Sequence, residues 1–168
     1  DELPDEFLDE LRIVAKKRTD GRAAILGEVW ENAADKIAYG KRRRYLRGGQ
    51  LDSVMNYPFR NAVLDLLLRR DAGAFVRTLT EIYASYPREV SDSLMNLLGT
   101  HDTARILTVL GDPEEGGGRS NAELSRARLS GDARRQAISL LRIASTLQYT
   151  VYGFPSVYYG DEAGLEGY

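Results

Sequence analysis

The sequence contains no cysteine, and it is poor in other residues that often carry chemistry. Without cysteine, disulfide bonds and thiolate metal sites are excluded. His101 is the only histidine, which excludes a metal site built from several histidines and leaves a Ser-His-Asp triad without distinctive support. The charges nearly cancel, at 23 Lys and Arg against 25 Asp and Glu. The net charge therefore gives no general attraction to nucleic acid or to an anionic membrane.

Long apolar runs are absent too. No run approaches the roughly 20 residues of a membrane-spanning helix, and the first residues are acidic rather than signal-like. We therefore expect a cytoplasmic protein, or an interior piece of a longer one. The chain begins at Asp1 without methionine, so we expect further sequence upstream. Its 168 residues, 43% of them hydrophobic, suit one domain with a core, and neither a repeat nor a linker divides residues 1–168.

Helical and strand-like patterns alternate along the chain. Apolar residues at helical spacing predict helices over about residues 3–18, 58–70, 74–86 and 132–148. Short apolar runs predict strands at residues 23–30, 51–57, 93–98 and 156–159. This alternation indicates an α/β fold made of parallel β/α units with right-handed crossovers. Four strands fit either half a barrel or a small open sheet, and the pattern alone does not choose between them.

Two segments have the composition of loops. Residues 114–121 are rich in glycine and acidic residues, and Ser120 or Asn121 could cap the helix that follows. Residues 38–50 contain a basic cluster at 41–47. A solvated loop or helix face is the ordinary interpretation of such a cluster. A nucleic-acid-binding module is the remote alternative, because Tyr45 lies among the basic residues.

Carboxylates that follow predicted strands are the main candidates for chemistry. Glu28 comes directly after an apolar strand and is followed by Val29 and Trp30. β/α proteins place reacting groups at the carboxyl ends of their strands, and an apolar setting suits a carboxylic acid that acts as a general acid. Asp102 follows the third strand, next to His101. The non-catalytic alternative for Glu28 is a solvated loop residue. For Asp102 it is the N-cap of a helix that starts at Thr103.

Four strings of residues resemble, in order, the signatures of strands five to eight of the α-amylase superfamily (glycoside hydrolase family 13). The resemblance is strongest to the branch of cyclomaltodextrinases, neopullulanases and maltogenic amylases. The strings run from Ile25 to Ala33, from Met55 to Arg60, from Asn96 to Arg105 and from Gly153 to Glu162. The resemblance implies that residues 1–168 form the C-terminal half of a (β/α)₈ catalytic barrel, which is a partial TIM barrel. It covers nearly the whole chain.

The resemblance also assigns roles by motif position. These enzymes cleave α-glucosidic bonds with retention, using one carboxylate as nucleophile and another as acid and then base. Glu28 matches the acid/base, and Asp102 matches the carboxylate that binds sugar hydroxyls and stabilises the transition state. His101 matches a histidine that donates to a sugar hydroxyl, and Trp30 an aromatic that stacks on the sugar, with packing at the mouth of the barrel as its alternative. Asn56 and Tyr57 lie where they could touch ligand or merely support the site.

Two departures from the family pattern qualify this assignment. Thr100 stands where many amylases have asparagine before the His-Asp pair. The nucleophilic aspartate, part of an Arg-x-Asp pattern after strand four, has no counterpart here, and residues 1–5 look like its continuation. We therefore expect the nucleophile just upstream and the chain alone to be inactive. Any calcium site would lie in the missing half, and no cofactor or metal is expected from residues 1–168.

Further expectations concern partners. The expected ligand is an α-glucan oligosaccharide, with no nucleic acid and no membrane as partner. Half a barrel leaves strand edges and an inner face uncovered, so we expect the chain to self-associate. A member of the same superfamily that binds carbohydrate or serves as a scaffold without catalysis is the alternative function.

Overall fold

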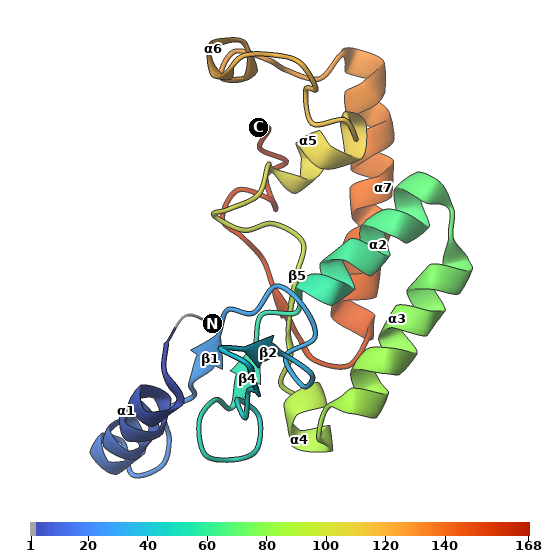
Figure 1. The fold of residues 1–168 in the computed structure, drawn as a ribbon. Helices are drawn as coiled ribbons and strands as arrows, with labels where there is room; N and C mark the ends of the chain where they lie inside the picture. Colours follow the sequence, from blue (N-terminus) through green and yellow to red (C-terminus); the bar gives the residue numbers. More distant parts are fainter. Residues whose placement is uncertain (1–2) are drawn as a thin grey trace.

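The computed structural model describes residues 3–168. Its helices and strands alternate along the chain as the sequence predicts (Figure 1). None of the helices in these residues is both long and apolar enough to cross a membrane. The elements are α1 (Asp5–Arg18), β1 (Leu26–Gly27), β2 (Ile37–Ala38), β3 (Lys41–Arg42), β4 (Ser53–Val54), α2 (Tyr57–Arg69), α3 (Ala72–Ser85), α4 (Arg88–Ser91), β5 (Met95–Leu97), α5 (Ile106–Gly111), α6 (Asn121–Leu124), α7 (Gly131–Thr150) and β6 (Phe154–Ser156).

Four short strands follow one another as parallel neighbours. β1 pairs with β4, with Leu26 opposite Ser53, and β5 pairs with β6, with Asn96 opposite Pro155. A parallel bridge between Met55 and Met95 joins the two pairs. In the resulting order, β1, β4, β5, β6, helices connect β4 to β5 and β5 to β6, whereas the connection from β1 to β4 contains the strands β2 and β3 and no helix. The predicted parallel arrangement is therefore confirmed.

The strands differ in detail from the sequence prediction. The run at residues 23–30 forms only a two-residue strand, because β1 pairs on one side alone, with β4, among the described residues. The last strand ends at Ser156, so the prediction of residues 156–159 is wrong by about two residues. Tyr158 and Tyr159 instead lie in the turn after the strand, against the guanidinium of Arg105.

Residues 38–50 are not simply a loop, as their composition suggested. β2 and β3 form an antiparallel hairpin whose two-residue turn is Tyr39–Gly40. Both turn residues have positive φ, 53° and 72°, which is the conformation that matches the twist of a tight hairpin. Tyr39 is an unusual residue in this conformation, which explains why the hairpin signal is weak in the sequence.

Capping residues set the beginnings of several helices. Asn56 accepts a hydrogen bond from the Phe59 N–H at the start of α2, and Ser130 accepts one from the Ala133 N–H at the start of α7. Ser120 forms a reciprocal capping box with Glu123 at α6, which confirms Ser120 of the two predicted candidates. These short side chains satisfy N–H groups that have no partner within the helix.

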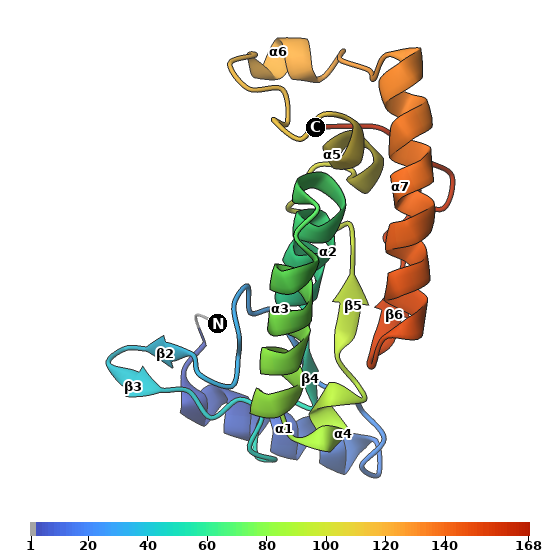
Figure 2. The ribbon, with the colours of Figure 1, turned by 90° about the vertical axis from the view of Figure 1, so that its right-hand side faces the viewer.

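The core has two parts. One lies around β1 and β4 and contains Val29, Val54 and Leu94. The other lies among α2, α5 and α7 and contains Phe59 and Leu107. α2 packs against α3, α5 packs against α7, and α7 runs alongside β6 (Figure 2). These helices lie beside the strands and leave the ends of the strands to the connecting loops.

Several apolar side chains face solvent in the described part of the chain. Leu8 is the only buried residue of α1, whereas Phe7, Leu11 and Val14 on the same helix are exposed. Leu26 on β1 is also exposed. The apolar spacing that predicts α1 therefore does not produce a buried stripe here. Self-association of the chain, which would cover such surfaces, stays a prediction.

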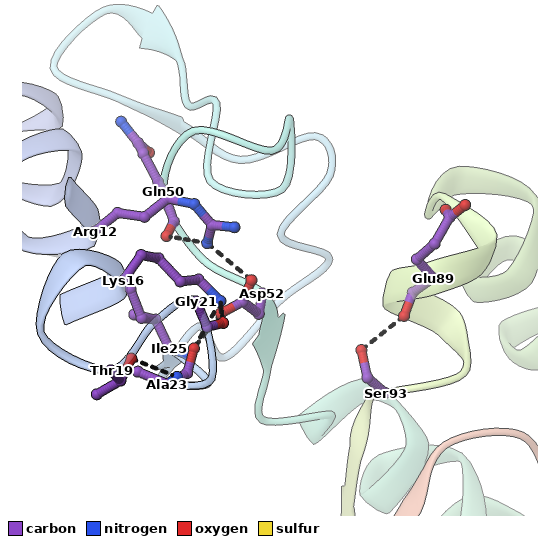
Figure 3. Close-up of polar contacts among 10 residues, drawn as sticks. All are labelled: Arg12, Lys16, Thr19, Gly21, Ala23, Ile25, Gln50, Asp52, Glu89 and Ser93. Carbon is purple, nitrogen blue, oxygen red and sulfur yellow. Dashed lines mark hydrogen bonds and ion pairs between the residues drawn. The ribbon is translucent and has the colours of Figure 1, made fainter.

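A charged network ties α1 to the amino end of the strands (Figure 3). The carboxylate of Asp52, just before β4, accepts hydrogen bonds from Arg12 at 2.8 Å, from Lys16 at 2.9 Å and from the Ile25 N–H at 2.9 Å. Nearby, Ser93 donates to the backbone oxygen of Glu89. The network fixes the starts of β1 and β4, and thereby the residues at their carboxyl ends.

Candidate active site at the carboxyl ends of the strands

Glu28 leaves β1 at its carboxyl end and is partly buried there. The hydroxyl of Tyr57, which begins α2 just beyond β4, donates to Glu28 Oε1 at 2.8 Å. The two residues are brought together because β1 and β4 are parallel neighbours whose carboxyl ends lie side by side. The hydrogen bond orients the carboxyl group of Glu28.

The Tyr57 hydroxyl remains protonated near neutral pH. Burial, then the hydrogen bond to Glu28 and the negative charges of Glu28 and Asp102, raise the pKa of Tyr57 to about 12. Tyr57 is therefore a steady hydrogen-bond donor to Glu28. The influence of Asp102 also shows that this carboxylate, from a distant part of the sequence, lies nearby.

His101 and Asp102 follow β5, in the turn that leads to α5. One ligand atom from each of Glu28, His101 and Asp102 lies within 4.8 Å of the others. His101 Nε2 is 3.4 Å from Asp102 Oδ2, and both side chains are more than half exposed. The structure thus brings together the two carboxylates that the sequence predicts to meet at one edge of a parallel sheet.

The turn that carries these residues is held by hydroxyl groups. The backbone N–H groups of Asp102 and Thr100 donate to Thr100 Oγ1 and Thr103 Oγ1, each at 3.2 Å. α5 begins only at Ile106, so the alternative in which Asp102 caps a helix starting at Thr103 is wrong. Thr100, which departs from the asparagine of many amylases, is buried and serves the local fold.

Trp30 lies beside this cluster. Its ring stacks on that of Tyr57, with centroids 4.0 Å apart and planes 14° from parallel. Trp30 is 48% exposed, whereas Tyr57 is buried. Packing at the mouth of the strands, one of the two roles expected for Trp30, therefore accounts for its contact with Tyr57. The exposed part of the indole remains accessible from solvent.

Asn56 supports the site rather than lining it. It is 2% exposed, accepts from the Phe59 N–H, and donates to Asn96 Oδ1 at 2.9 Å. Its amide thereby links β4 to β5 and caps α2. Of the two roles that the sequence left open for Asn56, support is the one that this geometry favours.

The cluster offers polar groups that suit either a sugar or a metal ion. Glu28, His101 and Asp102 are the one trio within residues 3–168 whose atoms are placed to share an ion. The same groups can accept and donate hydrogen bonds to neighbouring hydroxyls, and the aromatic Trp30 beside them can cover an apolar sugar face. The aromatic ring next to the carboxylates favours a carbohydrate ligand.

The sequence interpretation assigned no role to three residues of the loops after β5 and β6, namely Gly99, Arg105 and Asp161. The guanidinium of Arg105 lies over the rings of Tyr158 and Tyr159, and its Nη1 is 3.8 Å from Asp161 Oδ1. Asp161 packs so closely on Gly99 that a side chain at residue 99 would collide with its carboxylate. These contacts hold the loop after β6 against the turn after β5. Gly99 and Asp161 both lie within the matched strings, which was the available signal.

Burial changes the ionisation of Asp161. It raises the pKa of this carboxyl to about 6, although Arg105 acts in the opposite direction. Asp161 Oδ1 has no hydrogen-bond partner among the described residues. Asp161 is therefore a carboxylate whose ionisation the fold opposes.

The basic cluster at residues 41–47 is largely neutralised within the molecule. Arg43 is buried and lies 3.4 Å from a carboxylate oxygen of Asp5, and Arg44 pairs with Asp9. Arg42 pairs with Asp35 in the same way. The cluster thus anchors the hairpin region to α1, which argues against the nucleic-acid alternative.

Comparisons with known proteins give the same picture over the whole chain. The family described as "Alpha amylase, catalytic domain" matches residues 4–168. A cyclomaltodextrinase of a Bacillus species is 38% identical, over 99% of this chain and 24% of that protein. Neopullulanase 2 of Thermoactinomyces vulgaris is 32% identical, over 99% of this chain and 23% of that protein.

Solved structures extend the similarity to the fold. The cyclic α-maltosyl-(1→6)-maltose hydrolase of Arthrobacter globiformis, in complex with cyclic α-maltosyl-(1→6)-maltose, superimposes with a TM-score of 0.73 at 25% identity, over 98% of this chain and 30% of that one. The chain spans about a quarter of the length of the curated relatives it matches. With the family matched from residue 4 to residue 168, the chain belongs to the alpha-amylase catalytic domain family.

Proposed function

We propose that this chain is part of a retaining glycoside hydrolase that cleaves α-1,4 glucosidic bonds, with α-1,6 bonds as a secondary candidate, in starch-like oligosaccharides or cyclodextrins. The observation that supports it most is the meeting of Glu28, His101 and Asp102 within 4.8 Å at the carboxyl ends of the strands. Carboxylates on either side of the scissile bond are the machinery of this reaction. The relatives named above, and the Arthrobacter enzyme with its bound cyclic sugar, support the substrate class.

In this proposal Glu28 acts first as acid and then as base. It protonates the glycosidic oxygen as the bond breaks, and it later removes a proton from the water that hydrolyses the glycosyl-enzyme ester. The hydrogen bond from Tyr57 keeps the Glu28 carboxyl oriented between these steps. Asn56, which links β4 to β5, holds the start of α2 and hence Tyr57 in place.

Asp102 and His101 act on the sugar rather than on the leaving oxygen. Asp102 binds sugar hydroxyls and stabilises positive charge as the ring becomes oxocarbenium-like. His101 donates to a neighbouring hydroxyl, and Trp30 stacks on the sugar on the leaving-group side. The exposure of all three side chains is compatible with contact to a ligand.

The nucleophile lies upstream in this proposal. The four parallel strands β1, β4, β5 and β6 are the fifth to eighth strands of the barrel, and the nucleophilic aspartate follows the fourth, before α1. Without that aspartate no covalent glycosyl intermediate forms, so the chain alone does not hydrolyse its substrates. Calcium-binding residues, where the enzyme has them, lie in the same upstream half.

Assays of the chain, alone and in its natural reading frame, test the proposal. We expect no detectable hydrolysis of maltoheptaose or β-cyclodextrin by the purified chain, and retention of the α-anomer by the protein extended upstream through the Arg-x-Asp pattern. Turnover by the chain alone at the rate of the extended protein would contradict the role of the upstream nucleophile. An extended protein that binds maltoheptaose without cleaving it would favour the non-catalytic alternative.

A further inference from the structure

A second group of tyrosine and polar side chains lies at the opposite end of the strands. Tyr152 precedes β6, Tyr83 lies near the end of α3, and Ser91 and Asp92 lie just before β5. These residues are at the amino ends of β5 and β6, whereas Glu28 and Asp102 follow the carboxyl ends of β1 and β5. Figure 2 shows the end of α3, α4 and the starts of β5 and β6 toward the same end of the molecule. We call Tyr83, Ser91, Asp92 and Tyr152 the amino-end site.

The surface at this end is hollowed. Two adjoining hollows, of about 670 and 400 Å³, share Tyr83, Asp92 and Tyr152 in their walls. Tyr83 and Tyr152 meet edge to face, with ring centroids 5.4 Å apart and an angle of 81° between the planes. An edge-to-face pair leaves ring surface uncovered, and Tyr152 is 67% exposed.

The exposed ring of Tyr152 stands on a fixed backbone. The Tyr152 carbonyl oxygen accepts a hydrogen bond from Asn96 Nδ2 at 2.8 Å and another from the Tyr83 hydroxyl at 3.4 Å. Gly153 follows with a φ of +108°, where a side chain would collide with the Leu94 carbonyl oxygen and the Asn96 amide. The chain therefore enters β6 along one path, so the backbone that carries this ring does not have to be ordered on binding.

Polar groups complete the amino-end site. Ser91 lines the smaller hollow but is only 7% exposed, and its Oγ is buried beneath the surface, so this residue shapes the wall of the hollow rather than offering it a hydrogen bond. Asp92 is half exposed, 3.6 Å from Arg88, and adds carboxylate oxygens that accept from sugar hydroxyls.

We propose that the amino-end site binds an α-glucan chain without cleaving it. Pyranose rings present an apolar face to Tyr152 while their hydroxyls bond to the half-exposed carboxylate of Asp92. The choice of an α-glucan as the ligand rests on the proposed function. A glucan held at this end raises the local concentration of substrate for a cleavage site at the other end.

Chemical-shift mapping of the isotope-labelled chain with maltoheptaose separates the two ends in one titration. We expect backbone amide shifts at residues 83, 91, 92 and 152 in addition to those around Glu28 and Asp102. Replacing Tyr152 with alanine should weaken binding at the amino-end site about tenfold, because a ring face is lost. Tyr152→Phe should retain binding within about twofold, since it keeps the ring.

Tyr149→Ala is the matched control, because Tyr149 is 61% exposed on the last turns of α7 but lies outside both hollows. It should leave the amino-end site unchanged, and dispersed amide signals in each spectrum verify the fold. Shifts confined to the surroundings of Glu28, or an unchanged affinity in Tyr152→Ala, would overturn the second site. Shifts at the amino-end site with none near Glu28 would instead count against the proposed function.

Discussion

Carboxylates at the two ends of the strands have different surroundings. At the amino end, Asp52 faces two cations and a backbone N–H. Burial alone would raise its pKa, but the hydrogen bonds from Lys16, the Ile25 N–H and Arg12 outweigh it, and the pKa of Asp52 is lowered. At the carboxyl end, Glu28 and Asp102 lie close to each other, and the pKa of the nearby Asp161 is raised.

The difference separates carboxylates that hold the fold from those that can act on a ligand. The charged form of Asp52 stabilises the fold, because its hydrogen-bond partners come from α1 and from the start of β1. Glu28 and Asp102 instead lie close to each other and to His101, in side chains that are at least partly exposed. A group of polar side chains that a ligand can reach is a candidate functional site. Three substitutions can break or sharpen this comparison.

The largest effect should come from Glu28→Gln in the protein extended upstream. The amide cannot transfer the proton, so we expect kcat to fall about 10²–10⁴-fold with little change in stability. Rates with maltoheptaose and thermal melting of both proteins measure the two effects. Glu31→Gln is the control, because Glu31 lies on the same loop, is half exposed and forms an ion pair with Lys36. Equal losses of activity in the two variants would contradict the assignment.

Asp52→Asn should lower stability instead. Losing charged hydrogen bonds to Arg12 and Lys16 should lower the free energy of unfolding by about 2 kcal/mol at pH 7, or the melting temperature by about 4–8 °C. The folded-state pKa of Asp52 is lowered, so its contribution is complete above the unfolded-state pKa of about 4. The contribution is lost as pH falls through the folded-state pKa.

Urea unfolding at a series of pH values checks this prediction. The difference between wild type and Asp52→Asn should shrink as the pH falls below about 4. Asp65→Asn serves as the control, because Asp65 pairs with the exposed Arg69 on one helix and should change the free energy by less than about 0.5 kcal/mol. A difference that persists unchanged at low pH would show that the carboxylate charge is not what stabilises this end.

Asp161→Asn should change stability in the opposite sense. The folded-state pKa of Asp161 is raised to about 6, so the folded state holds its proton above the unfolded-state pKa. Stability therefore falls as pH rises from about 4 to about 6 in the wild type. The asparagine variant should lack this slope and be more stable at pH 7 by up to about 3 kcal/mol, because the rise of the pKa from about 4 to about 6 already includes the opposing effect of Arg105. Melting temperatures of the wild type and the variant at pH 5, 6 and 7 check this prediction. A variant less stable than the wild type at pH 7 would contradict it and would show that the ion pair with Arg105 outweighs the cost of burial.

Particular residues show how far the sequence could be interpreted. Helical spacing of apolar residues predicts α2, α3 and α7, and the alternation predicts the parallel pairing of the strands, as the structure has them. The hairpin at Tyr39–Gly40 was missed, because its first turn residue is an unusual one for positive φ. The proximity of Glu28 to Asp102 could be expected, because each residue follows the carboxyl end of a predicted parallel strand. The contact of Asp161 with Gly99 could not, because it depends on how two loops pack.

The sequence by itself determined the family, the order of the helices and strands, and which residues follow each strand. These properties are local, or lie in motifs of a few residues. The tertiary structure alone decided that Asn56 is a buried support and that Asp52 and Asp161 ionise in opposite senses. It also decided that tyrosines 69 residues apart, Tyr83 and Tyr152, form one surface. Burial and charge at a side chain depend on neighbours from distant parts of the chain, and only packing brings those neighbours together.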